Sequence, residues 1–193
     1  MHLRALVVFC ALSGLLAGTA VSANAQQAKM GPQHKAPKTN AEKIRNALSA
    51  APRSVGKDAS VIDIDDKGNI RTLRQGKGEF TCIPDDPHTP GNDPMCVDKN
   101  GLEWAKAWLG KKEPPAGRIG IGYMLRGGSD ASNDDPYAMA PAPGKKWIDT
   151  GPHVMILGGA KMMEGTPKHA GDPHKPYIMW PGTPYEHLML PVK

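Results

Sequence analysis

The sequence predicts an α+β fold, a single domain in which a mainly antiparallel sheet is combined with two or so helices and long Gly/Pro-rich loops. Short segments in which apolar and polar residues alternate are typical of strands. Two longer segments repeat their apolar residues at helical spacing. Strands and helices do not alternate regularly along the chain, as a parallel sheet built from strand–helix–strand units would require. The 22 glycines and 19 prolines indicate long connections between the elements.

The first 25 residues have the pattern of a secretory signal peptide. An early Arg4 is followed by an apolar stretch from Ala5 to about Ala17 and by small residues that end in Ala23-Asn24-Ala25. The apolar stretch is shorter than the roughly 20 residues of a membrane-spanning helix, so we expect cleavage before Gln26 and a product that is not transmembrane. The sequence therefore predicts a periplasmic or secreted protein.

Residues 26–38 are polar, basic and poor in apolar side chains, which predicts a flexible arm before the domain at residues 39–193. The whole chain carries 24 Lys and Arg against 19 Asp and Glu. The basic residues lack the interleaved aromatic side chains on which nucleic-acid bases stack, and export removes most nucleic-acid partners. We therefore expect no nucleic-acid partner. A solvated surface is the favoured interpretation of the charge, and contact with an anionic envelope component is the alternative.

The domain is predicted to begin with a helix and a hairpin. Thr39 and Glu42 form a capping-box pattern at the start of an amphipathic helix, and Pro52 ends it. Residues 60–65 and 70–74 alternate in polarity and flank a turn that contains glycine. These two segments therefore predict a pair of antiparallel strands.

A third predicted strand, residues 78–83, leads into a segment enclosed by two cysteines. Signal cleavage removes Cys10 and leaves Cys82 and Cys96, and an even number of cysteines in an exported chain predicts a disulfide. The enclosed segment contains four prolines and little that can be buried, so it needs a covalent constraint. The spacing is not C-x-x-C, which favours a structural bridge over a redox-active pair.

The clearest helix is residues 99–109, with Asp98 as its N-cap, a broad apolar stripe and Gly110 at its end. Residues 118–125 follow as a strand, and residues 126–146 form a long polar loop. The last third of the chain contains three short strand-like segments, residues 153–158, 177–180 and 187–192.

The long polar loop is the first candidate site. Two adjacent glycines could present backbone N–H groups to an anion, with polar side chains beside them. The same composition is typical of ordinary capping loops, which is the alternative interpretation. Together with a tyrosine near the C-terminus, the candidate ligand-binding residues are Gly127, Gly128, Ser129, Asp130, Asn133 and Tyr185. A second polar group, His88 with Asp85, Asp86 and Asp93, is an acid/base candidate in the enclosed loop.

A His-x-Met pattern occurs twice. In a strand, His153 and Met155 share one face, and so do His187 and Met189. Imidazole and thioether groups suit soft metals, copper(I) above all, so the four residues are a candidate copper site if the two strands pair. The aliphatic residues on the opposite faces are expected to form the core. Methionine as a core filler and histidine bonded to backbone are the alternative interpretation.

A third interpretation makes His153 and His187 the catalytic base or substrate clamp of a small hydrolase-like enzyme, beside Tyr185 and Glu186. Such a site needs a nucleophile or a metal, and the sequence identifies neither.

The segments PGNDPMC, GGSDASNDDPYAM, GPHVMI and PYIMWPGTPYEHLM resemble those of a family of small exported bacterial proteins with no assigned activity. The resemblance covers most of the chain after about Ser60. It implies export and a single domain, and it implies no catalytic residue. The sequence therefore predicts a binding or envelope-associated protein rather than an enzyme, with an unknown small ligand or envelope component as its partner. Copper binding is the first alternative and hydrolysis the second.

Overall fold

The computed structural model describes residues 34–159, 163–169, 172 and 174–192. The predicted signal peptide and most of the predicted basic arm lie outside these residues. The described residues form a single sheet-rich domain with three helices and a mixed sheet, which agrees with the predicted α+β class. No helix within them is long and apolar enough to cross a bilayer.

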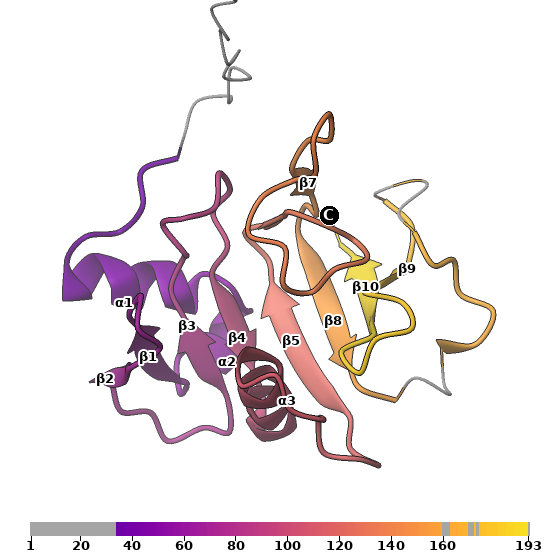
Figure 1. The fold of residues 1–193 in the computed structure, drawn as a ribbon. Coiled ribbons are helices and arrows are strands. Elements are labelled where there is room, and N and C mark those ends of the chain that lie inside the picture. Colours follow the sequence, from indigo (N-terminus) through magenta and orange to yellow (C-terminus); the bar gives the residue numbers. More distant parts are fainter. Residues whose placement is uncertain (1–33, 160–162, 170–171, 173, 193) are drawn as a thin grey trace, which may run out of the picture. The chain divides into compact units, whose positions relative to one another are not determined.

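The helices are α1 (Asn40–Leu48), α2 (Arg53–Gly56) and α3 (Lys99–Leu109). The strands are β1 (Ser60–Ile64), β2 (Ile70–Arg74), β3 (Thr81–Ile83), β4 (Met95–Val97), β5 (Gly120–Met124), β6 (Ser129–Asp130), β7 (Ile148–Asp149), β8 (His153–Leu157), β9 (Tyr177–Met179) and β10 (His187–Pro191). Eight of them form one sheet in the order β2-β1-β3-β4-β5-β8-β10-β9, and β6 and β7 form a separate pair (Figure 1). All neighbouring strands are antiparallel except β1 and β3, so the prediction of a mainly antiparallel sheet is confirmed.

The local signals at the start of the domain act as predicted. Glu42 N donates to Thr39 Oγ1 over 3.2 Å, and Thr39 N donates to Glu42 Oε2 over 2.9 Å, which completes the capping box of α1. The helix ends at Leu48, before Pro52 is reached. In the hairpin of β1 and β2, the Asp65 carboxylate accepts hydrogen bonds from the turn backbone and fixes the turn.

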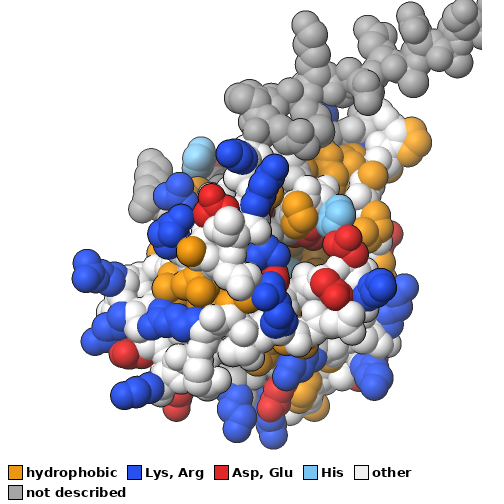
Figure 2. Space-filling view, turned by 90° about the vertical axis from the view of Figure 1, so that its left-hand side faces the viewer, with side chains coloured by type: hydrophobic (Ala, Val, Ile, Leu, Met, Phe, Trp, Pro, Cys, Tyr) orange, Lys and Arg blue, Asp and Glu red, His pale blue; other side chains and the backbone are white. Residues whose placement is uncertain are grey.

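Two helices cover opposite faces of the sheet. Cys96 belongs to the buried cluster under α1, whereas the next residue, Val97, belongs to the cluster under α3. Because successive strand residues point to opposite faces, the two helices lie on opposite sides of β4. Figure 1 shows α3 crossing in front of β4 and β5. Figure 2 shows that Lys and Arg side chains prevail on the face that carries α1 and β2, with fewer Asp and Glu side chains among them. Lys43 and Arg71 both pair with Asp63 there.

The predicted disulfide between Cys82 and Cys96 is present. The two residues are direct partners on β3 and β4, and both are fully buried under α1. The bridge therefore closes the base of the loop between β3 and β4 inside the core.

The burial of β8 and β10 differs from the expectation. His153, Met155 and Leu157 are buried, whereas Val154 and Ile156 on the opposite face are only half-buried. The expectation that the aliphatic face forms the core is therefore wrong for these strands. The cause lies in the helices: α3 packs on β5 and β4, whereas the main contacts of α1 are with β1, β2, β3 and β4 at the other end of the sheet.

Candidate functional site

The two His-x-Met segments lie side by side. β8 and β10 are antiparallel hydrogen-bonded neighbours, and Met155 is the direct partner of Met189. Alternate residues share a face, so His153 and His187 point to the same side of the sheet as this methionine pair. The two histidines lie diagonally across the methionine pair, one on each strand. Each histidine is the register partner of an apolar residue at an end of the other strand. All four side chains are buried.

Glycines on β5 and α3 make room over this face. A Cβ atom on Gly122 would lie 2.7 Å from Met155 Cε, so the bare backbone of β5 accommodates the thioether. A Cβ atom on Gly120 would lie 2.4 Å from the backbone nitrogen of Gly101 in α3. Because neither Gly120 nor Gly101 has a side chain, α3 approaches the sheet closely. The tryptophans of α3 consequently lie over β8 and β10.

Aromatic rings enclose His187. Its ring lies 5.4 Å from that of Trp104 and 5.0 Å from that of Trp180, with an interplanar angle of 74° in both cases. Trp104 and Trp180 are nearly parallel to each other, and Tyr185 packs edge-on against Trp104 at 6.1 Å. Aromatic faces carry negative charge density, so this enclosure favours a cation beside the imidazole.

Both histidines are held in the same tautomer by the same local contact. His153 Nδ1 lies 2.7 Å from the carbonyl oxygen of Gly151, and His187 Nδ1 lies 2.9 Å from that of Tyr185. A carbonyl oxygen only accepts hydrogen bonds, so each Nδ1 carries the proton and each Nε2 carries a lone pair. His153 Nε2 is buried and has no hydrogen-bond partner among the residues described. Metal-binding histidines are typically oriented by such a bond from the second ring nitrogen.

Burial keeps both rings neutral. It lowers the pKa of His187 to about 4, against the opposing effect of the hydrogen bond to Tyr185, and the nearby His153 lowers this pKa further. Burial also lowers the pKa of His153. Because both pKa values lie below the ordinary range of histidine, the Nε2 lone pairs are available at neutral pH.

The glycine-rich loop binds a carboxylate of this same chain. Ser129 N donates to Asp93 Oδ1 over 3.0 Å, and Ser129 Oγ donates to Asp93 Oδ2 over 3.4 Å. Gly127 N donates to the carbonyl oxygen of Met124, and Gly128 O accepts from Thr150 N. Of the two glycine N–H groups that the sequence offered to an external anion, that of Gly127 is thus used within the fold, and Ser129 beside them binds Asp93.

The other predicted ligand residues lie in different places. Asn133 Nδ2 donates to the carbonyl oxygens of Lys168 and Ile178 and so ties the long loop to β9 and the segment before it. Tyr185 Oη donates to the carbonyl oxygen of Lys112, beside the tryptophans. The predicted ligand set is therefore divided among three locations, and only Gly127 to Asp130 form a continuous group.

Sequence reasoning missed the aromatic partners of His187. In the sequence, Trp104 fits the apolar stripe of the helix predicted at residues 99–109, and Trp180 fits the strand-like segment at residues 177–180. The contact between them depends on the packing of α3 over the sheet, which no spacing in the sequence encodes. The one local signal was the position of Trp180 and His187 at the two ends of a short Gly/Pro-rich turn.

Comparisons with protein-family models, with curated proteins and with solved structures found no match. Within the described ranges, no group of three or more His, Cys, Asp or Glu side chains is arranged to hold a metal ion. The His/Met group differs from such clusters because half of its donors are thioethers.

Proposed function

We propose that this chain is an exported binding protein that holds a soft monovalent cation of the copper(I) class on the buried face of β8 and β10. The observation that carries the proposal is the register of the two strands. It pairs Met155 with Met189 and directs His153 and His187 to the same face.

The chemistry of the four donors selects the cation. Thioether sulfur and imidazole nitrogen are ligands suited to copper(I), whereas Ca²⁺ and Mg²⁺ prefer oxygen. All four donors are neutral and buried. A divalent ion in such a place would keep its full charge in a medium of low dielectric constant, which is costly. A single positive charge costs less and is favoured by the surrounding tryptophan faces.

Export is part of the proposal. The N-terminal pattern predicts a signal peptide, and a disulfide such as Cys82–Cys96 persists in the oxidising compartments outside the cytosol. In this proposal the predicted small ligand is the cation itself. An association of the protein with the cell envelope is compatible with cation binding.

Binding is favoured over hydrolysis by the surroundings of the histidines. A nucleophilic mechanism requires a hydroxyl or thiol within hydrogen-bond reach of the basic nitrogen. In the part of the chain that the structure describes, neither His153 nor His187 forms a hydrogen bond with a Ser, Thr or Cys side chain. The neighbours of His187 are aromatic rings.

The test is an anaerobic titration of the mature protein with copper(I), and in parallel with silver(I), followed by native mass spectrometry and thermal unfolding. We expect one bound ion per chain. At a free-ion concentration about 100 times Kd, binding stabilises the folded state by about 2.7 kcal/mol. For a chain of this size that corresponds to a rise in Tm of roughly 5–10 °C.

A double variant, Met155→Leu with Met189→Leu, tests the site itself because leucine replaces the buried volume without the sulfur. It should retain the fold and lose the ion-dependent rise in Tm. Met163→Leu is the matched control, since Met163 is also buried but lies outside this face. Absence of an ion from the wild-type protein, or an equal rise in Tm in the double variant, would refute the proposal.

A further inference from the structure

The face that carries the His/Met group has two more methionines beside it. Met124 on β5 is the direct register partner of His153, and Met179 on β9 is the direct register partner of His187. We call Met124 and Met179 the outer methionines. Both are buried in the same cluster as the methionine pair of β8 and β10. Register partners on antiparallel strands point to the same side and have Cβ atoms about 5 Å apart, so each histidine has a thioether next to it on the outer neighbouring strand.

The register relates the two halves of this face by an approximate twofold axis. The axis is perpendicular to the sheet and passes between Met155 and Met189, which we call the central pair. Rotation about it exchanges β8 with β10 and one histidine with the other. It also exchanges the outer neighbours β5 and β9, and therefore one outer methionine with the other (Figure 1). The sheet thus presents the same set of donors twice.

The surroundings of Met124 place its thioether near His153. A Cβ atom on Gly128 would lie 3.0 Å from Met124 Cε and 3.0 Å from Thr150 Oγ1, so a glycine in the turn after β5 makes room for this methyl group. Thr150 N donates to the carbonyl oxygen of the same glycine, and the next residue, Gly151, orients His153. The methyl end of Met124 therefore lies beside the segment that holds the imidazole.

The surroundings of Met179 are shaped by an unusual backbone. Trp180 has a φ of 54°, a value that residues other than glycine adopt rarely and at a cost. In a regular strand its side chain would point to the face opposite that of Met179. Instead the Trp180 ring packs 5.0 Å from the ring of His187 and belongs to the same buried cluster as Met179. The end of β9 thus encloses the second histidine together with its outer methionine.

We propose that the soft cation exchanges between two equivalent positions on this face. One position is formed by His153 and Met124, the other by His187 and Met179, and the central pair completes both. This inference rests on the proposed function and adds two ligands to it.

The two positions hold one ion between them. Two positive charges on one buried face repel each other more strongly than in water because the local dielectric constant is low, so a second ion is disfavoured. The central pair lies between the histidines and belongs to both positions. An ion can therefore cross from one position to the other without losing its sulfur ligands. The face is a short path for the ion across three neighbouring strand pairs.

The first test is an NMR titration of the mature wild-type protein with silver(I), which needs no variant. The methyl signals of Met124 and Met179 should shift in parallel with the Nε2 signals of both histidines and reach their end points at one ion per chain. If the wild type binds no silver(I), both the proposed function and this inference are wrong. If it binds one ion and the outer methyl signals stay in place, the proposed four-donor site survives and the two-position inference alone is wrong.

The second test removes the outer ligands one at a time, with leucine retaining the buried volume. In Met179→Leu the ion should remain at the intact position, so the silver-induced shift of His153 Nε2 should increase about twofold and that of His187 should fall to a small fraction. Met124→Leu should give the mirror result. Each single variant should raise the Kd for silver(I), measured by competition with a chelator, only about twofold, because one of two equivalent positions remains.

The double variant, Met124→Leu with Met179→Leu, leaves neither position intact. Its Kd for silver(I) should rise by roughly tenfold or more, since each position has lost a direct ligand. Met163→Leu, a change of the same kind at a buried methionine outside this cluster, should bind as the wild type does. A double variant with the Kd of the wild type, or single variants in which both histidine signals still shift equally, would overturn the inference.

Discussion

His187 shows how burial fixes the chemical state of one side chain. The ring is enclosed by Trp104, Trp180 and the sheet, and its Nδ1 is committed to the carbonyl of Tyr185. Removal from water makes protonation of the ring costly, so the Nε2 atom keeps a lone pair that can bind a metal ion. The same arrangement at His153 shows that the two residues follow one local rule, a hydrogen bond to the carbonyl two residues earlier.

The lowered pKa of His187 predicts a specific dependence of stability on pH. A histidine whose pKa is lower in the folded than in the unfolded state contributes stability above the unfolded pKa of about 6.5, and this is lost as the pH falls toward 4. The shift corresponds to about 3 kcal/mol. Urea unfolding at pH 7, 5.5 and 4 should therefore show a smaller loss of stability in His187→Leu than in the wild type.

The wild type must be compared with His187→Leu because Asp93 and Asp130 change the pH dependence of stability in the opposite direction. Their raised pKa values make the folded state more stable as the pH falls. Equal slopes of stability against pH in the wild type and in His187→Leu would show that His187 is not held neutral.

Neutral imidazoles also predict that cation binding survives mild acid. Protons compete for a metal site only near the pKa of its ligands, and burial lowers the pKa of both histidines. Silver(I) affinity, measured by competition with a chelator of known affinity, should change little between pH 7 and pH 5. A loss of tenfold or more per pH unit over this range, as ordinary histidines would cause, would contradict the neutral state of the rings.

At the scale of the elements, the contact between α3 and β5 places the aromatic side chains. Gly101 and Gly120 let the two backbones meet with no side chain between them. An alanine at position 120 would force α3 away from the sheet, because its Cβ would lie 2.4 Å and 2.5 Å from two backbone atoms of Gly101.

Gly120→Ala should therefore lower the free energy of unfolding by about 3 kcal/mol and weaken the ion-dependent rise in Tm. Gly117→Ala is the comparison, since no atom lies within 4 Å of the new Cβ there. It should cost only about 1 kcal/mol, because its backbone has a positive φ of 70°. Chemical denaturation of both variants measures the difference, and equal costs would refute the role of close packing.

Most elements could be predicted from the sequence because their signals are local. The capping box at Thr39, the cap at Asp98 and the alternation in residues 153–157 each report on a few neighbouring residues. The buried face of β8 could not be read in this way. Alternation shows that two faces differ, but which of them is covered depends on where α3 packs, and that is a contact between segments about 50 residues apart.

The same distinction between local signals and tertiary contacts applies to the candidate site. The sequence offered the four His/Met side chains correctly as members of two shared faces, because period-two alternation is local. It offered the loop residues as one ligand set, yet Asn133 and Tyr185 are drawn to different partners by the tertiary structure. The role of Asp93 as the anion bound by Ser129 depends on the path of the loop between Cys82 and Cys96.

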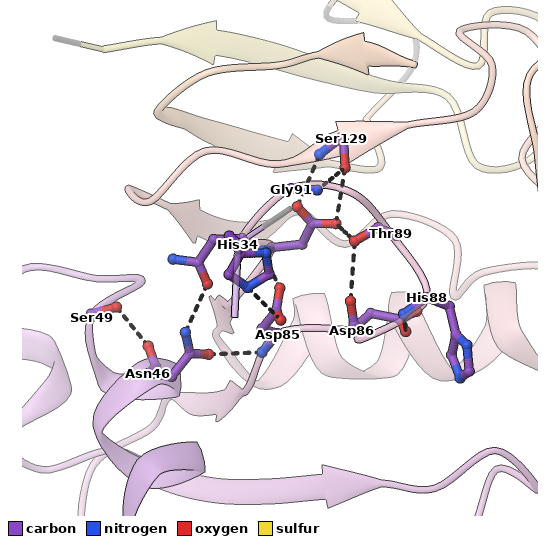
Figure 3. A network of polar contacts seen from close by, with 11 residues as sticks. His34, Asn46, Ser49, Asp85, Asp86, His88, Thr89, Gly91 and Ser129 are labelled. Carbon is purple, nitrogen blue, oxygen red and sulfur yellow. Dashed lines mark hydrogen bonds and ion pairs between the residues drawn. The ribbon is translucent and has the colours of Figure 1, made fainter. Parts of the chain in front are cut away.

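At the scale of the whole molecule, the disulfide and a few hydrogen bonds both restrain the loop of residues 84–94. Cys82 and Cys96 join neighbouring strands at its base. Hydrogen bonds from Gly91 N to Ser129 Oγ and from Ser129 N to Asp93 attach its far part to β6 (Figure 3).

Loss of the disulfide should destabilise the fold by about 3 kcal/mol, since a loop of this length is then released in the unfolded chain. The double variant Cys82→Ala with Cys96→Ala, compared with the wild type by urea denaturation, measures the effect. The wild type should show no free thiol at these two positions when it is alkylated after unfolding without a reductant. Labelling of both cysteines in that experiment would show that the bridge does not form in the protein.

The central claim is that the two His-x-Met strands hold one soft cation between them. The most direct measurement is an NMR titration with silver(I) in which the methionine methyl groups and the histidine ring nitrogens are observed separately. The account predicts that the methyl signals of Met155 and Met189 and the Nε2 signals of His153 and His187 shift together and saturate at one ion per chain. A shift confined to Met139, whose side chain is 85% exposed, with the four buried groups unchanged, would contradict it.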